Sequence, residues 1–144
     1  IVAPYQLDAR LCISYLTIEH RGSIPEPLRP LMGNRVYGCD DCQLVCPWNR
    51  FARRTAETDF LPRGGLDTAT LLELFGWDEA SFQTRTQGTA IRRIGYPCWM
   101  RNLAVAIGNG PGGPAAIGAL SARSADPSPL VREHVQWALR RLGA

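Results

Sequence analysis

The sequence predicts a mostly α-helical chain with two regions, a cysteine-containing region over residues 1–58 and a helical region over residues 59–144. In most segments apolar residues recur at the three- and four-residue spacing of an amphipathic helix. Gly and Pro turns separate these segments, and four of the five cysteines precede Trp48. With 144 residues and 45% hydrophobic composition, the chain can bury one sizeable core.

In the first region a helix is expected over residues 9–20, with Asp8 as its N-cap and Gly22 at its end. This assignment places Cys12 in the first turn of the helix. A single helical turn is expected over residues 40–45, before the proline that follows the last cysteine of this region. Residues 49–65 are polar and interrupted by Pro and Gly, which indicates a surface connection.

The second region is expected to contain short helices, with Asp67 and Asp78 as N-caps of the first two and Pro97 in the first turn of the fourth. These helices cover Thr68–Phe75, Asp78–Thr84, Ala90–Ile94, Pro97–Ile107, Ala115–Ala125 and Val131–Leu142. Residues 126–143 resemble the second helix of a HEAT-type repeat, and residues 99–109 suit the matching element of a preceding unit. An ordinary helical bundle is the alternative for this HEAT-like C-terminal region.

The most specific pattern is C-x2-C-x3-C-P, formed by Cys39, Cys42, Cys46 and Pro47. Bacterial ferredoxins hold [4Fe–4S] clusters with C-x2-C-x2-C-x3-C-P, in which the last cysteine serves a neighbouring cluster. Cys12 lies upstream as a fourth thiol. The pattern therefore predicts that residues 1–58 form part of a ferredoxin-like iron–sulfur module.

A structural zinc site and a set of disulfides are the alternatives to an iron–sulfur site. Zinc prefers a second cysteine pair or histidines. Neither His20 nor His134 sits beside the cysteines, and both are expected at helix ends or on a solvated face. Five is an odd number of cysteines, which argues against a closed disulfide framework. A reducing, cytoplasmic location fits better, and Cys98 is expected to be a buried structural thiol.

The charge pattern is unusual because all 16 basic residues are arginine, with a net charge of +3. Arginine binds phosphates through a planar, bidentate fork. The candidates for phosphate contacts are Arg50, Arg53, Arg54, Arg92 and Arg93. Arg50, Arg53 and Arg54 form one basic cluster in the sequence, and Arg92, Arg93 and Arg101 form another. A solvated protein face is the alternative for each cluster. No apolar run is long enough for a membrane span, so no membrane partner is expected.

Several residues near the cysteines have a structural interpretation beside the functional one. Asp40 and Asp41 suit N-caps of the short turn after Cys39. Tyr37 and Trp48 flank the loop and are expected to shield a cluster from water. The aromatic residues expected in the core are Phe75, Trp77 and Phe82.

With these segments in order, the chain resembles the C-terminal part of bacterial tRNA epoxyqueuosine reductases. The likeness rests mainly on residues 1–22 and 33–50, and extends to Phe60-Leu-Pro-Arg, Ala90-Ile-Arg-Arg and Arg101-Asn-Leu-Ala-Val-Ala-Ile-Gly-Asn. The resemblance implies reduction of epoxyqueuosine to queuosine at the wobble position of tRNA, with a cobalamin, two [4Fe–4S] clusters and an external electron donor. Electrons from such clusters must be gathered next to the substrate, which is the cobalamin's task.

The resemblance also assigns roles to single residues. Cys12, Cys39 and Cys42 would bind one cluster, and Cys46 would bind the other. Ser14, Cys39 and Asp40 match positions near the cobalamin, and Arg21 matches a tRNA-contacting position. The catalytic acid of the family and the remaining cluster cysteines have no counterpart here, so this chain alone is expected to be inactive and to bind cluster poorly. The protein is expected to be a monomer.

Two other functions stay open at this point. One is a stand-alone ferredoxin-type electron-transfer module, and the other is a helical scaffold stabilised by zinc. The electron donor and the set of tRNAs do not follow from the sequence.

Overall fold

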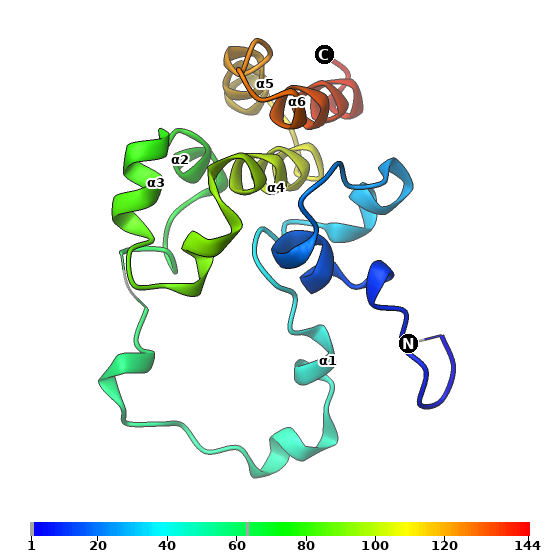
Figure 1. Ribbon diagram of the computed structural model, residues 1–144, viewed down its shortest axis with the longest axis vertical. Coiled ribbons are helices and arrows are strands. Elements are labelled where there is room, and N and C mark those ends of the chain that lie inside the picture. The colour runs from blue at the N-terminus through cyan, green and yellow to red at the C-terminus, as the bar shows by residue number, and fades with distance from the viewer. Residues whose placement is uncertain (1, 63) are drawn as a thin grey trace.

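The computed structural model describes residues 2–62 and 64–144, and within them it is mostly helical with no strand. The α-helices are α1 (Asp41–Leu44), α2 (Leu71–Phe75), α3 (Glu79–Arg85), α4 (Tyr96–Gly108), α5 (Pro114–Ala122) and α6 (Pro129–Leu142). Short 3-10 helices are η1 (Ala9–Leu11), η3 (Glu26–Met32), η4 (Pro47–Phe51), η5 (Thr58–Phe60) and η6 (Ala90–Ile94), and η2 (Tyr15–Glu19) is π-helical. Figure 1 shows these elements in place.

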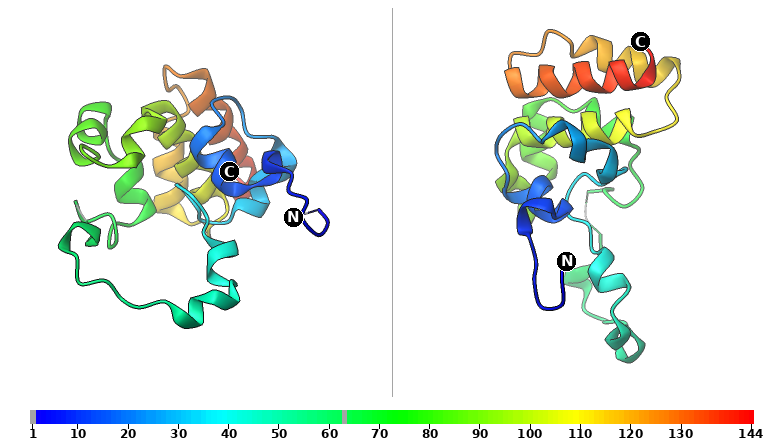
Figure 2. Two further views of the ribbon diagram at one scale, coloured as in Figure 1. Left: turned by 60° about the horizontal axis from the view of Figure 1, so that its bottom comes forward. Right: turned by 90° about the vertical axis from the view of Figure 1, so that its right-hand side faces the viewer.

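Helix α4 is the centre of the fold, because every residue from Cys98 to Gly108 is buried. It contacts α6 on one side, α2 and α3 on another, and η3 from the first region. Helices α5 and α6 lie together across one end of the molecule, with α4 beneath them (Figures 1 and 2). The two regions therefore share one hydrophobic core.

The aromatic residues expected in the core lie around Trp99 at the start of α4. Phe75 and Phe82 are buried, and the partly buried Trp77 stacks on Trp99 with ring centroids 6.0 Å apart. Cys98 is buried next to them, as predicted. This cluster anchors α2 and α3 to α4.

Several sequence-based helix boundaries were right. Asp78 caps α3 by accepting a hydrogen bond from the Ser81 N–H, and Pro97 lies in the first turn of α4. Helix α6 and the 3-10 turn η6 also lie where they were predicted. Local capping and proline rules were sufficient for these elements.

The predicted helix over residues 9–20 is wrong in its first half. Asp8 does accept a hydrogen bond from the Arg10 N–H, but η1 ends at Leu11 and Cys12 is extended, with φ −83° and ψ 128°. A second helix begins after Cys12, whose carbonyl accepts from the Leu16 N–H at 3.0 Å. Cys12 thus lies at a break between two helical turns and not inside one.

Two further predictions are corrected by the structure. Helix α2 begins at Leu71 with Thr70 as its cap, and not at Thr68 with Asp67, because Thr70 and Glu73 form a reciprocal capping box. His134 is fully buried in α6, since it lies on the same helical face as buried apolar residues, whereas His20 does lie at a helix end.

Residues 47–62 form an exposed segment that extends away from the helical core (Figures 1 and 2). This agrees with the surface connection predicted for residues 49–65, of which Arg63 lies outside the described residues, as does Ile1 at the start of the matching segment 1–22. Among the described residues no helix has the length and apolar character needed to cross a membrane.

Candidate functional site

The candidate site is a cavity of about 630 Å³ between the first residues of the chain and the cysteine loop. Cys12, Cys39 and Cys42 all line it, together with Ser14 and Asp40. Its remaining lining residues are Val2, Tyr5, Gln6, Leu7, Asp8, Leu11, Ile13 and Asp41. The fold thus brings thiols from two separate segments to one cavity with largely apolar walls.

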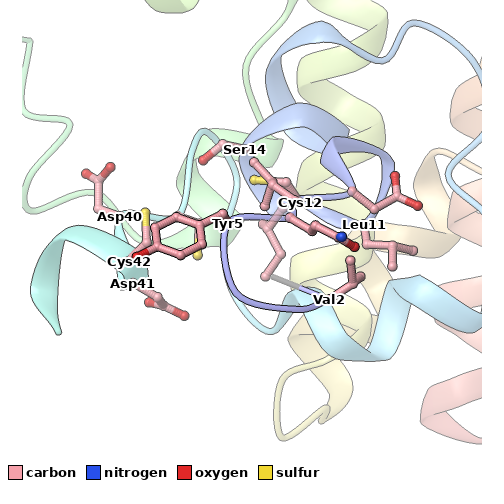
Figure 3. A pocket seen from close by; sticks show the side chains of 13 residues that line it. Val2, Tyr5, Leu11, Cys12, Ser14, Asp40, Asp41 and Cys42 are labelled. Carbon is pink, nitrogen blue, oxygen red and sulfur yellow. The ribbon is translucent and has the colours of Figure 1, made fainter. Parts of the chain in front are cut away.

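Figure 3 shows how the labelled side chains are distributed around this cavity. Cys12 and Ser14 come from the η1–η2 segment, Cys42 and Asp40 come from the cysteine loop, and Tyr5 lies between the two groups in this view. Tyr5 belongs to a tight turn closed by the Val2 N–H, which donates to the Gln6 carbonyl at 3.0 Å.

The break after η1 explains how Cys12 reaches the cavity. Cys12 has an extended backbone and directly precedes the second helix. Its carbonyl accepts the first hydrogen bond of that helix, from the Leu16 N–H. Ser14 follows at the start of that helix. The π-helical turn over Tyr15–Glu19 continues this helix. Such turns are rare in proteins, and those that occur are often found at functional sites.

The cysteine loop is shaped by two residues with positive φ. Gly38 has φ 78°, and Asp40 has φ 58°, a left-handed conformation that aspartate tolerates better than most residues. The Gly38 N–H donates to Thr17 Oγ1 at 3.0 Å, which joins the loop to the helix after Cys12. Helix α1 then makes one turn, as predicted, and carries Cys42.

The two aspartates of the loop are not side-chain caps of this turn, although one alternative expected that. Asp40 occupies the N-cap position, but its carboxylate accepts from the Gln43 side chain at 3.0 Å and not from a backbone N–H. Asp41 is held by Arg35, at 2.7 Å and 2.8 Å. The Arg35 guanidinium lowers the pKa of the Asp41 carboxyl, so this carboxylate is ionised at neutral pH.

Cys46 does not line the cavity and lies at the start of η4, beyond α1. Trp48 is exposed and packs on Phe51, with ring centroids 5.6 Å apart. It therefore covers none of the cavity in this structure, while Tyr37 packs against the core. Cys46 is thus the one cysteine of the C-x2-C-x3-C-P pattern that does not line the cavity.

Among the described residues, no three His, Cys, Asp or Glu side chains converge closely enough to hold a single metal ion. A mononuclear zinc site would need its sulfurs at about 2.3 Å from one centre. His20 binds the Ser23 carbonyl and His134 is buried in α6, so neither joins the thiols. A donor set of three thiols around a large cavity suits a polynuclear cluster better than one ion.

Three of the predicted tRNA-binding arginines gather near η6. Arg21 donates to the carbonyls of Ile94 at 2.5 Å and Arg93 at 3.1 Å. Arg93 also pairs with Glu19, and Arg92 donates to Gln83 at 2.7 Å. All three are exposed, but each has contacts that stabilise the fold.

The other three arginines lie on the exposed segment after the cysteine loop. The Arg50 guanidinium lies 4.6 Å from the centroid of the Phe51 ring. Arg53 and Arg54 are exposed and form no ion pair within residues 2–62 and 64–144. Their charges are accordingly available to a partner.

Sequence reasoning missed one group of residues next to the site. Arg101 was grouped with Arg92 and Arg93 as a basic cluster, but it is fully buried, together with Asn102. The available signal was an Arg-Asn pair inside an otherwise apolar run.

Comparisons with known proteins agree with this geometry. A family model described as a 4Fe-4S double cluster binding domain matches residues 1–49. Epoxyqueuosine reductases from Pseudomonas aeruginosa and Escherichia coli K12 are 63% and 58% identical over 99% and 96% of this chain, and the matches cover 39% and 36% of those proteins. The chain thus spans about two fifths of the length of these relatives.

Solved structures give the same result. A crystal structure of an epoxyqueuosine reductase with an epoxyqueuosine-modified tRNA-Tyr stem loop superposes with a TM-score of 0.88 at 30% identity. The match covers 98% of this chain and 37% of the other. A Bacillus subtilis epoxyqueuosine reductase gives the same TM-score and identity. By sequence and by fold, this chain belongs to the epoxyqueuosine reductase family.

Proposed function

We propose that the chain provides the iron–sulfur part and part of the tRNA-binding surface of an oxidoreductase that converts epoxyqueuosine in tRNA to queuosine. The observation that carries this proposal is the meeting of Cys12, Cys39 and Cys42 at one cavity. The 4Fe-4S family match over residues 1–49 and the names of the relatives support it.

In this proposal Cys12, Cys39 and Cys42 bind one [4Fe–4S] cluster, because thiolates are the ligands that such clusters require. Cys46 binds a second cluster, which agrees with its position outside the cavity. A cluster at the cavity supplies single-electron transfer. The apolar side chains of Val2, Leu7 and Leu11 would limit its exposure to water, which affects its reduction potential.

The same cavity wall is the proposed contact with a cobalamin. Ser14, Cys39 and Asp40 line the cavity and offer a hydroxyl, a sulfur and a carboxylate as polar groups. A cobalamin bound there would supply the two-electron step of epoxide reduction. The cavity would form only one wall of the cobalamin site, because Ser14, Cys39 and Asp40 are too few to enclose a large cofactor.

The two arginine groups are the proposed tRNA contacts. Arg53 and Arg54 carry charges that no residue of the described structure neutralises, and Arg21, Arg92 and Arg93 present exposed guanidiniums near η6. Phosphate contacts of this kind give affinity without reading the base sequence. We also propose that α4–α6 form a HEAT-like region and that the iron–sulfur part of the chain ends at residue 58.

A chimeric enzyme tests this function. The segment of the Escherichia coli relative that matches this chain is replaced by residues 1–144, which are 58% identical over 96% of the chain. The chimera is expected to restore queuosine to the tRNA of a strain that lacks its own reductase. Failure of a folded chimera that retains iron would contradict the proposed substrate.

Anaerobic reconstitution of the 144-residue chain tests the cluster directly. Iron and sulfide are added with a small thiol as an external fourth ligand, and iron per chain is measured. Cys12→Ser, Cys39→Ser and Cys42→Ser are expected to lose iron, whereas the buried Cys98→Ser is the matched control and is expected to retain it. Stoichiometric zinc in place of iron would favour the zinc-stabilised scaffold.

A further inference from the structure

The middle of α4 contains two adjacent polar residues, Arg101 and Asn102, in an otherwise apolar and buried stretch. Both side chains are fully buried. A buried guanidinium is costly unless its donors are paired, and the described residues give Arg101 no carboxylate partner within ion-pair distance. Its hydrogen bonds must therefore go to neutral groups.

Arg101 pairs all five N–H groups of its guanidinium, and three of these hydrogen bonds go to the segment that follows Cys12. Nη1 donates to the carbonyls of His20 at 2.8 Å and Gly22 at 2.7 Å, and Nη2 donates to the Leu16 carbonyl at 2.9 Å. Nη2 and Nε also donate to Asn102 Oδ1, at 2.9 Å and 3.0 Å. The carbonyls at a helix C-terminus lack donors within the helix, and here the Arg101 guanidinium donates to them.

Asn102 connects this helix to the cysteine loop. Its Nδ2 donates to the Thr17 carbonyl at 2.8 Å and to the Val36 carbonyl at 2.8 Å. Thr17 also accepts from the Gly38 N–H, directly before Cys39. One buried amide therefore joins the backbone after Cys12 to the backbone before Cys39.

We infer that Arg101 and Asn102 are positioning residues that set the place of the Cys12 thiol relative to Cys39 and Cys42. They bind the backbone of both segments that carry the thiols, and they stand on the most buried helix of the fold. The inference rests on the proposed function in one respect, since it takes these thiols as cluster ligands. Buried polar networks that are fully paired are rigid, which suits this task.

The same helix offers a matched control. Asn109 at the end of α4 also donates two hydrogen bonds from its amide to backbone carbonyls, those of Arg29 at 2.8 Å and Gly33 at 3.0 Å. These residues belong to η3 and the turn after it, which carry no thiol. Loss of either amide removes the same chemistry, but only loss of Asn102 affects the thiol segments.

The test uses the 144-residue chain with Cys42→Ser and Cys46→Ser, so that Cys12 and Cys39 are the accessible thiols and Cys98 stays buried. A bis-alkylating bimane becomes fluorescent only after both of its arms have reacted. Its second step measures how often the two thiols lie within reach of each other. Peptide mapping by mass spectrometry confirms which pair has been joined.

Asn102→Ala is expected to slow the second step about tenfold, because small misplacements of reacting groups have large effects on rate. Asn109→Ala is expected to stay within about twofold of the parent, because its partners lie in η3 and the turn after it, which carry no thiol. Equal rates in the two variants, whether both fast or both slow, would overturn the inference.

Thr17→Val keeps the test decisive if Asn102→Ala does not fold. It removes the hydroxyl that accepts from Gly38 while the shape of the side chain is kept. A slower second step in this variant supports the inference, and an unchanged rate contradicts it. Because the cross-link forms without iron, the two claims can fail separately. Normal cross-linking in this background, together with no iron bound by the unsubstituted chain in the reconstitution, would refute the proposed cluster and leave the positioning role intact.

Discussion

His134 illustrates how one buried side chain connects the two regions. Its ring is fully buried in α6. Nδ1 donates to the Leu130 carbonyl at 2.8 Å, so Nε2 is the acceptor for the Ile24 N–H at 3.2 Å. A protonated ring has no acceptor nitrogen, and therefore only the neutral form fits this site.

The pH dependence of stability follows from this burial. Desolvation lowers the pKa of His134 to about 4 from 6.5, so below pH 6.5 the unfolded chain binds a proton that the folded chain does not. The free energy of unfolding is therefore expected to fall as the pH drops from 6.5 to 4, by about 3 kcal/mol from this residue. Urea unfolding across this range measures it.

His134→Gln separates this effect from the carboxylates that also titrate at low pH. Glutamine keeps a donor for Leu130 and an acceptor for Ile24 but does not titrate. The variant is expected to lose less stability than the parent between pH 6.5 and 4. An identical pH dependence in the two proteins would show that His134 is not the source.

At the scale of elements, the contact between α4 and α6 depends on Gly108. A Cβ built on Gly108 would lie 2.8 Å from Ala138 Cβ and 2.9 Å from its Cα. The obstacle includes backbone, which cannot move aside as a flexible side-chain end can. The absence of a side chain at this position thus allows the two helices to approach closely.

Gly108→Ala is therefore expected to lower the free energy of unfolding by a net of about 1–2 kcal/mol, since overpacking costs about 1–3 kcal/mol and helix propensity returns part of it. Gly118→Ala in α5 is the matched control, because nothing lies within 4 Å of its added Cβ. That variant is expected to gain about 0.5–1 kcal/mol. Denaturant unfolding of both checks the pair, and a stabilised Gly108→Ala would refute the close approach.

The elements also show where sequence reasoning succeeds and where it fails. Asp78 and Pro97 mark helix starts by local rules, and the structure confirms both. The break at Cys12 was missed because the apolar spacing after Asp8 suits one continuous helix, and spacing does not show that the helix after Cys12 is held by Arg101, a residue far along the chain. His134 was misplaced for a similar reason, because its acceptor nitrogen is satisfied by Ile24 from the other region.

The candidate site shows the same division. The C-x2-C-x3-C-P spacing pointed to iron–sulfur chemistry, and the family match over residues 1–49 agrees. Spacing alone does not show that Cys12 lines the same cavity as Cys39 and Cys42. That arrangement depends on tertiary hydrogen bonds, such as the one from Gly38 to Thr17.

At the scale of the whole molecule, the arginines have two different tasks. Arg101 and Arg29 are buried and bind backbone or side-chain groups of the fold. Arg53 and Arg54 stand on the segment that extends away from the core, with no ion pair to residues of the described structure. A net charge of only +3 thus conceals a local concentration of positive charge.

Binding of an RNA stem loop is expected to weaken with salt, because each neutralised phosphate releases counterions. Arg53→Ala with Arg54→Ala should lower the affinity and reduce the slope of log K against log salt by about 2, one for each lost contact. Arg140→Ala with Arg141→Ala removes the same charge from α6, at the other end of the molecule in Figure 1. This control pair should leave the slope close to that of the parent. Equal slopes for the two double variants would mean that net charge, and not the exposed segment, governs RNA binding.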